Sequence, residues 1–249
     1  ALNVTTTSGA ITLTNTGNTF ANASLNTSGS DDASLYDASA LNITGAMVGG
    51  TLTLTSAGSI GQTGAIHANA LSVTAANGDI SLTNAGNVFG IASLSTNAVG
   101  NASLIDASAF NISGATVGGT LTLSSGGSIG QTGDIHASAL AINTDGDITL
   151  TRTGNTFAVA TVTTTGTHNA SLTDASALSI AGANVGGTLT LSGANGISQT
   201  GAIHTAVLNA ATTQGAIVLT NPANTIGTAS LTTGGSDDAS ITDASALIV

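Results

Sequence analysis

Short stretches of alternating apolar and polar residues recur along the whole chain. The segments 2–4, 11–13, 41–43 and 52–54 each read apolar, polar, apolar, which is the pattern of a β-strand with one buried face. The residues between such segments are rich in Gly, Asn, Ser and Asp, which suit turns. No long stretch places apolar side chains at helical spacing, and the 33 Gly residues disfavour helix. The sequence therefore predicts an all-β protein.

The chain also repeats itself at a long and nearly constant interval of about 69 residues. The motif Asp-Ala-Ser-Ala keeps this interval, and its copies begin at Asp37, Asp106, Asp174 and Asp243. The motif Gln-Thr-Gly keeps it too, with copies at Gln62, Gln131 and Gln199. Such repetition is typical of solenoids, in which each unit packs on its neighbours. We expect one continuous segment, 1–249, with copies at approximately 1–69, 70–138, 139–206 and, in part, 207–249.

Large apolar residues recur at one third of this interval. Counted from Leu2 in steps of 23 residues, with one deleted residue on the way, every position is Leu or Val. The same count from Phe20 finds only Phe, Ile or Val. These columns predict a parallel β-helix (β-solenoid) with about 23 residues per coil, three coils per repeat and almost eleven coils in all. The preference of parallel crossovers for one hand predicts a right-handed coil.

Charge excludes several classes of partner. The chain has twelve Asp, no Glu, no Lys and one Arg, which give a net charge of −11 with His neutral. This field repels nucleic acid, and no basic patch offsets it. There is no Cys, so disulfides and thiolate chemistry are absent. No apolar run reaches the roughly 18 residues that a membrane helix needs, and no signal peptide opens the chain.

Both ends lie in mid-pattern. Residues 1–4 match 70–73, and the final residues match 38–43. Solenoids need caps at their ends, so we expect a slice of a longer rod, or a unit that associates end to end or laterally with copies of itself.

The tracts VGGTLTLTSAGSIGQTGAIHA (48–68), VGGTLTLSSGGSIGQTGDIHA (117–137) and LNVTTTSGAITLTNTGNTF (2–20) resemble the repeats of filamentous-haemagglutinin-like exoproteins. These are bacterial adhesins exported by two-partner secretion. The resemblance covers the shaft region of that family, because the family's secretion domain has no counterpart here. It implies a right-handed parallel β-helix, a secreted or cell-surface location, and a role in adhesion, aggregation or biofilm structure, with the receptor left open.

Candidate metal ligands are few. His67, His136 and His204 recur in one phase, one repeat apart, so they cannot converge on an ion. The acidic groups Asp31, Asp32 and Asp37, and Asp237, Asp238 and Asp243, could attract Ca²⁺, but solvated turns are the favoured interpretation. The repeated Asp of Asp-Ala-Ser-Ala suits an Asx-turn. We therefore assign no catalytic, cofactor-binding or metal-binding residue and expect no cofactor.

Three further motifs have structural interpretations. The Gly pairs 49–50, 118–119 and 186–187 suggest corners with positive φ, and the repeated Gln suits bonds to backbone carbonyls at a corner. Asn-x-Ser/Thr sequons, as at Asn3, Asn22, Asn42, Asn101 and Asn169, leave glycosylation open.

The function expected from the sequence is structural, not enzymatic: the shaft of a secreted or surface adhesin or filament. An ice- or surface-binding solenoid is an alternative, although Thr-x-Thr does not recur in one phase at the interval of the predicted coil. A polysaccharide-active β-helix is a weaker alternative, because the chain lacks the clustered Asp, Lys and Arg of such sites.

Overall fold

The computed structural model describes residues 1–249 and folds them as two compact units, Ala1–Ser125 and Gly126–Val249. The first unit contains β1 (Leu2–Thr5), β2 (Ile11–Leu13), β3 (Asn22–Asn26), β4 (Ala33–Asp37), β5 (Leu41–Ser56), β6 (Ile60–Gln62), β7 (Ile66–Ala75), β8 (Ile80–Leu82), β9 (Val88–Thr96), β10 (Ala102–Asp106) and β11 (Phe110–Ser125). The second contains β12 (Ile129–Gln131), β13 (Ile135–Thr144), β14 (Ile148–Leu150), β15 (Thr156–Thr164), β16 (Ala170–Asp174), β17 (Leu178–Gln199), β18 (Ile203–Leu219), β19 (Thr225–Thr232) and β20 (Ala239–Ile241).

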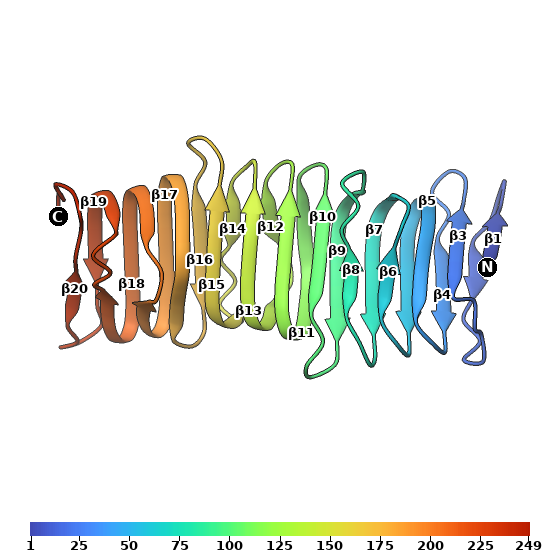
Figure 1. Cartoon of the computed structure of the whole chain (residues 1–249), viewed down its shortest axis with the longest axis horizontal. Helices are drawn as coiled ribbons and strands as arrows, with labels where there is room; N and C mark the ends of the chain where they lie inside the picture. The colour runs from blue at the N-terminus through green and yellow to red at the C-terminus, as the bar shows by residue number, and fades with distance from the viewer. The chain divides into compact units, whose positions relative to one another are not determined.

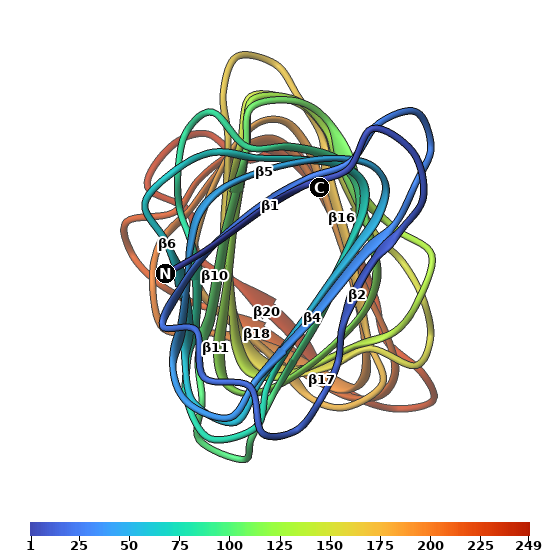
Figure 2. The same ribbon diagram turned by 90° about the vertical axis from the view of Figure 1, so that its right-hand side faces the viewer.

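Each unit is a parallel β-solenoid, as the alternation and the repeats predict. Every strand pair within a unit is parallel, for example β5 with β7 and β16 with β17. The turns of each unit lie side by side in Figure 1, and the blue and green turns of the first unit enclose a common interior in Figure 2. Strands such as β5, with 16 residues, and β17, with 22, run through corners where the sequence predicted short strands. Handedness and the continuity of the segment from 1 to 249 remain predictions.

The predicted coil is too long, because the chain makes about 12 turns of about 20 residues each. Strand pairing shows this directly: Leu41 pairs with Ile60, Ile60 with Ile80, and Ile80 with Ala102, and each of these steps is shorter than the predicted coil. The predicted columns contain inward-facing residues, but these residues do not lie over one another. Leu25 pairs with Val4 and Ala46, not with Leu2 and Val48.

The cause is that a sequence repeat is not a whole number of turns. Three turns carry the chain from Leu41 to Ala102, whereas the repeat equivalent of Leu41 is Phe110, eight residues farther on. This excess is about 0.4 of a turn. In the second unit, three turns lead from Ile129 to Leu189, and the repeat equivalent, Ile197, again lies eight residues farther. The prediction of three coils per repeat is therefore wrong, and each repeat spans about 3.4 turns.

The core of each unit is a narrow column of aliphatic side chains. Leu13, Leu35, Leu54, Val73 and Leu94 lie in one register across five turns of the first unit. Of these, Leu35, Leu54, Val73 and Leu94 are at most 2% exposed, and burying one such side chain contributes about 1.5–3 kcal/mol. The rings of Phe89 and Phe110 pack edge to face in the same unit, with centroids 5.9 Å apart.

The Gly pairs do not have the positive φ that the sequence suggested. Neither Gly49 nor Gly50 has positive φ, and the same holds for the pairs 118–119 and 186–187. Glycine is required there because the backbones of successive turns approach closely. A Cβ on Gly49 would lie 1.6 Å from the carbonyl oxygen of Gly29, and one on Gly186 would lie 1.8 Å from that of Gly166.

Candidate functional site

The carboxylate of each Asp-Ala-Ser-Ala motif joins two successive turns. In Asp106, Oδ2 accepts a hydrogen bond from the N–H of Phe89 on the preceding turn, at 2.7 Å. Its Oδ1 accepts bonds from the N–H and the hydroxyl of Ser108, at 2.6 and 2.8 Å. The bonds to Ser108 form the predicted Asx-turn, and the bond to the preceding turn was not predicted. Asp37, Asp174 and Asp243 repeat the arrangement with Phe20, Phe157 and Ile226.

Burial and these hydrogen bonds act on the carboxyl pKa in opposite directions. At Asp106 burial has the larger effect and raises the pKa above its ordinary value of 3.8, despite the bonds from Ser108 and Phe89. At Asp37 burial also raises the pKa, but the bonds from Phe20 and Ser39 outweigh it and lower the pKa overall. The balance at Asp243 is the same, with bonds from Ser245 and Ile226.

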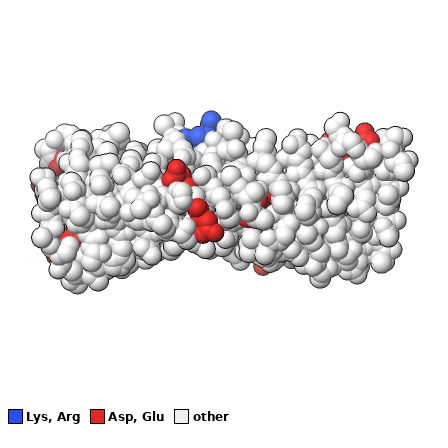
Figure 3. Space-filling model, turned by 90° about the horizontal axis from the view of Figure 1, so that it is seen from above, with Lys and Arg blue, Asp and Glu red and all other residues white.

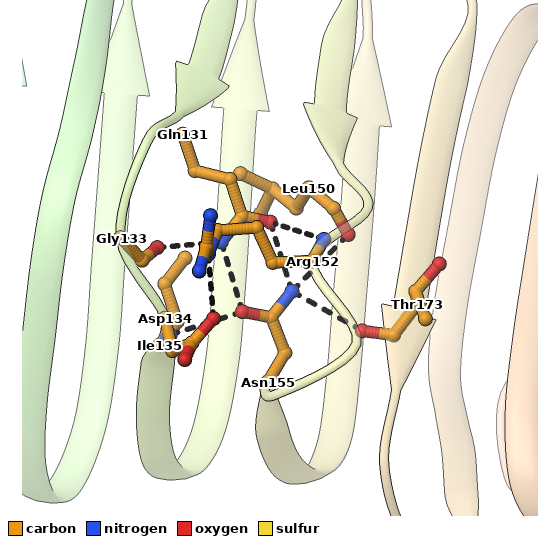
Figure 4. Close-up of polar contacts among 8 residues, drawn as sticks. All are labelled: Gln131, Gly133, Asp134, Ile135, Leu150, Arg152, Asn155 and Thr173. Carbon is orange, nitrogen blue, oxygen red and sulfur yellow. Dashed lines mark hydrogen bonds and ion pairs between the residues drawn. The ribbon is translucent and has the colours of Figure 1, made fainter.

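A pair of side-chain amides, in which the Asn is buried and the Gln only partly buried, occupies the neighbouring corner (Figure 4). The side chains of Gln131 and Asn155 exchange two hydrogen bonds, both of 2.8 Å, across successive turns. Asn155 also donates to the carbonyls of Leu150 and Thr173, at 3.3 and 3.2 Å, and accepts from the N–H of Ile135 at 3.0 Å. Gln131 donates to the carbonyl of Gly133 at 2.8 Å. Asn155 is fully buried, and the network leaves none of its hydrogen-bonding groups without a partner.

The amide pair recurs in Gln62 with Asn87 and in Gln199 with Asn224, again with two bonds of 2.8–2.9 Å each. The sequence predicted the bonds from Gln to a corner carbonyl, and these are present at Gly64 and Gly201. It missed the Asn partner. The available signal is a nearly constant spacing in sequence, 24 or 25 positions, from each Gln to an Asn that follows Gly or Ala.

Three Asp residues of the acidic groups, Asp31, Asp32 and Asp237, also accept hydrogen bonds from backbone N–H groups. Asp31 accepts from the N–H of Gly9 at 2.7 Å, and Asp32 accepts from that of Thr51 at 2.6 Å. Asn101 and Asn169 replace Asp32 one and two repeats later, and they accept from Thr120 and Thr188. Asp237 accepts from Gly215 at 2.7 Å. These carboxylates therefore bond to neighbouring turns, which the interpretation as solvated turns did not include.

The histidines lie on the surface. His136 and His204 contact the hydroxyls of Thr156 and Thr225 on the following turn, at 2.7 and 2.6 Å, and His67 is exposed. Nδ1 of His168 lies 3.3 Å from Oδ1 of Asp147. Nowhere does the structure gather three or more His, Cys, Asp or Glu side chains that could hold a metal ion.

The only basic side chain lies beside the amide pair. Nε of Arg152 is 2.6 Å from Oδ1 of Asp134, and both side chains are partly exposed. An open hollow of about 450 Å³ lies here, lined by Asp134, Thr151, Arg152, Thr153 and Gly154. A Cβ on Gly154 would lie 2.5 Å from Oδ2 of Asp134, so glycine provides the space for this carboxylate. The equivalent residues in the flanking repeats are Ala65 with Asn84 and Ala202 with Asn221, so the ion pair occurs once. Figure 3 shows charged atoms in small groups on an otherwise neutral surface.

These polar groups bond successive turns to one another. Every buried side-chain nitrogen and oxygen has a hydrogen-bond partner. The structure offers no helix of the length and apolar character that crossing a membrane requires.

Comparison with known families identifies the repeats. A family model described as "Repeats of unknown function (DUF5649)" matches residues 30–96, 99–164 and 167–233, which together make up most of the chain. The chain belongs to the DUF5649 family. No curated protein and no solved structure matches it.

The polar network has the same place in every DUF5649 repeat. Each match begins seven residues before the Asp of an Asp-Ala-Ser-Ala motif. Each match also contains both members of one amide pair, which are Gln62 with Asn87, Gln131 with Asn155, and Gln199 with Asn224. One DUF5649 repeat therefore contains one carboxylate bridge and one amide pair, and both bond to neighbouring turns.

Proposed function

We propose that this chain is part of the shaft of a secreted or cell-surface bacterial adhesin or filament, with a role in adhesion, aggregation or biofilm matrix. The observation that supports this most is the use of the polar side chains. The repeated carboxylates and amides bond to adjacent turns, so they act as links between turns.

The resemblance of the tracts at 2–20, 48–68 and 117–137 to filamentous-haemagglutinin-like exoproteins supports the secreted location and the adhesive role. A solenoid can be lengthened by adding repeats, because each turn contacts only its neighbours. Such a scaffold suits a protein that must extend away from a cell. The same property favours end-to-end association of copies, and lateral association is the alternative mode of assembly. The proposal gives the chain no catalytic role.

The test is an in-frame deletion of one repeat in the full-length gene of the source organism. We expect immunolabelling to find the protein on the cell surface or in the medium, and electron microscopy to show a shorter thin rod. Adhesion or aggregation should fall while the amount of exported protein stays constant. Protein confined to the cell interior, or compact globules under the microscope, would refute the proposal.

A further inference from the structure

The true turn length brings hydroxyl side chains into register on one outward face of the first unit. The first rank consists of residues paired from turn to turn, namely Thr12, Ser34, Thr53, Ser72 and Ser93. The second rank lies two residues farther along the same strands and contains Tyr36, Thr55, Thr74, Ser95 and Thr116. We call these two ranks the hydroxyl face. The sequence did not reveal it, because steps of one third of a repeat do not follow the turns.

The geometry of this face is regular in two directions. Neighbouring turns are about 4.8 Å apart, and residues two positions apart on one strand are separated by about 6.6 Å. The residues between the two ranks are the buried aliphatic column of Leu35, Leu54, Val73 and Leu94, which fixes the strands from below. The hydroxyls therefore form a two-dimensional lattice above a buried aliphatic column.

The hydroxyls of this face have almost no partners within the chain. The only side-chain hydrogen bond in the two ranks joins Ser93 to Ser72, at 3.2 Å. Hydroxyls at the corners behave differently: those of Ser39, Thr96 and Ser108 bond to nearby oxygen atoms. Thr53, Thr55 and Thr74 are also partly exposed. Their hydroxyls are therefore available to an external partner. Neither rank contains a charged residue.

We propose that the hydroxyl face binds ice. The prism face of hexagonal ice repeats its oxygen atoms at spacings close to those of the two ranks, and an uncharged array of hydroxyls and Thr methyl groups can order water in the same lattice. A polysaccharide site would be expected to have several aromatic platforms or acids, and this face has one Tyr and no acid. Tyr36 is also the one side chain that is much larger than its neighbours, so it interrupts the lattice.

The test uses the purified 249-residue chain. We expect it to enter a slowly growing ice crystal and to produce thermal hysteresis, neither of which an equal concentration of serum albumin does. The double variant Thr53→Lys/Thr74→Lys should lose most of both effects, because two charged side chains rise above the lattice. The control is the single variant Thr122→Lys, which is also outward and exposed, in a rank that Gly61 interrupts. This control should keep both effects, and Tyr36→Thr should increase them.

Circular dichroism must show that each variant folds, and Thr53→Gln/Thr74→Gln replaces the double Lys variant if that one does not. Exclusion of the unmodified chain from ice would overturn the proposal. An equal loss in Thr122→Lys would overturn the assignment to this face. A dimer in sedimentation that the double variant disrupts, without adsorption to ice, would overturn ice in favour of a second copy as the partner.

Discussion

The amide pair of Gln62 and Asn87 is the feature whose removal should damage the fold most. In Asn87, the side-chain carbonyl accepts from the N–H of Ile66 at 2.9 Å and from Gln62 at 2.8 Å. Its amide group donates to Gln62, to the carbonyl of Leu82 at 3.2 Å and to that of Ile105 at 3.0 Å. The substitution Asn87→Ala removes all five bonds from a fully buried position.

The magnitude follows from what is left behind. The N–H of Ile66 becomes a buried donor without a partner, which costs about 1–3 kcal/mol, and two carbonyls lose bonds worth about 0.5–1.5 kcal/mol each. Gln62 is only partly buried and can turn to water. We therefore expect a loss of about 2–6 kcal/mol in the free energy of unfolding. The matched control is Asn77→Ala, at an exposed Asn with one bond of 3.1 Å to Ala57, which should cost at most about 1 kcal/mol.

The assay is urea unfolding followed by far-ultraviolet circular dichroism, combined with hydrogen exchange at the amide of Ile66. In Asn87→Ala, protection of this amide should fall together with that of adjacent turns. In Asn77→Ala it should stay unchanged. Equal stability of the two variants, or full protection of Ile66 in Asn87→Ala, would show that the amide pair is not a main link between turns.

Three further predictions concern substitutions of single residues. The lowered pKa of Asp37 means that its contribution to stability is complete above the unfolded value near 3.8 and is lost as pH falls through the folded value. The raised pKa of Asp106 means the reverse, a contribution present at low pH and lost as pH rises through the folded value. Unfolding midpoints of Asp37→Asn and Asp106→Asn across acid pH should therefore change in opposite directions relative to the parent chain, and parallel curves would contradict this. Gly49→Ala should destabilise by about 1–3 kcal/mol or more, because its Cβ meets a backbone carbonyl. Gly61→Ala should be tolerated, because its nearest neighbour is 3.8 Å away, and equal melting temperatures would refute the argument. Arg152→Gln should change stability by at most about 1 kcal/mol, since the pair with Asp134 is partly exposed, and a larger loss on thermal unfolding would contradict this.

Much of the fold could be predicted from local patterns. Alternation identified the inward residues, because successive side chains of a strand point to opposite faces, and Leu25, Val48 and Leu71 are indeed buried. The stacking of these residues could not be predicted by dividing the repeat. Copies of a repeat can resemble one another in sequence without being a whole number of turns apart. In this chain the sequence recurs after about 3.4 turns, not after three.

The polar network was predictable only where both partners are close in sequence. The Asx-turn from Asp37 to Ser39 and the bond from Gln62 to Gly64 each span two residues. The bond from Phe20 to Asp37 and the pairing of Gln62 with Asn87 depend on the turn register, which the sequence interpretation had wrong. The role of Gly49 was missed for the same reason, since its constraint comes from Gly29 on another turn.

The fractional remainder in each repeat has a consequence for how such a gene can change. Recombination between copies inserts or removes a whole repeat, so each new junction joins segments that are already neighbours elsewhere in the chain. Within one solenoid, each added repeat nevertheless ends about 0.4 of a turn farther round than the copy before it. Variation in copy number would thus change the side of its own solenoid on which a given segment lies, as well as the number of turns.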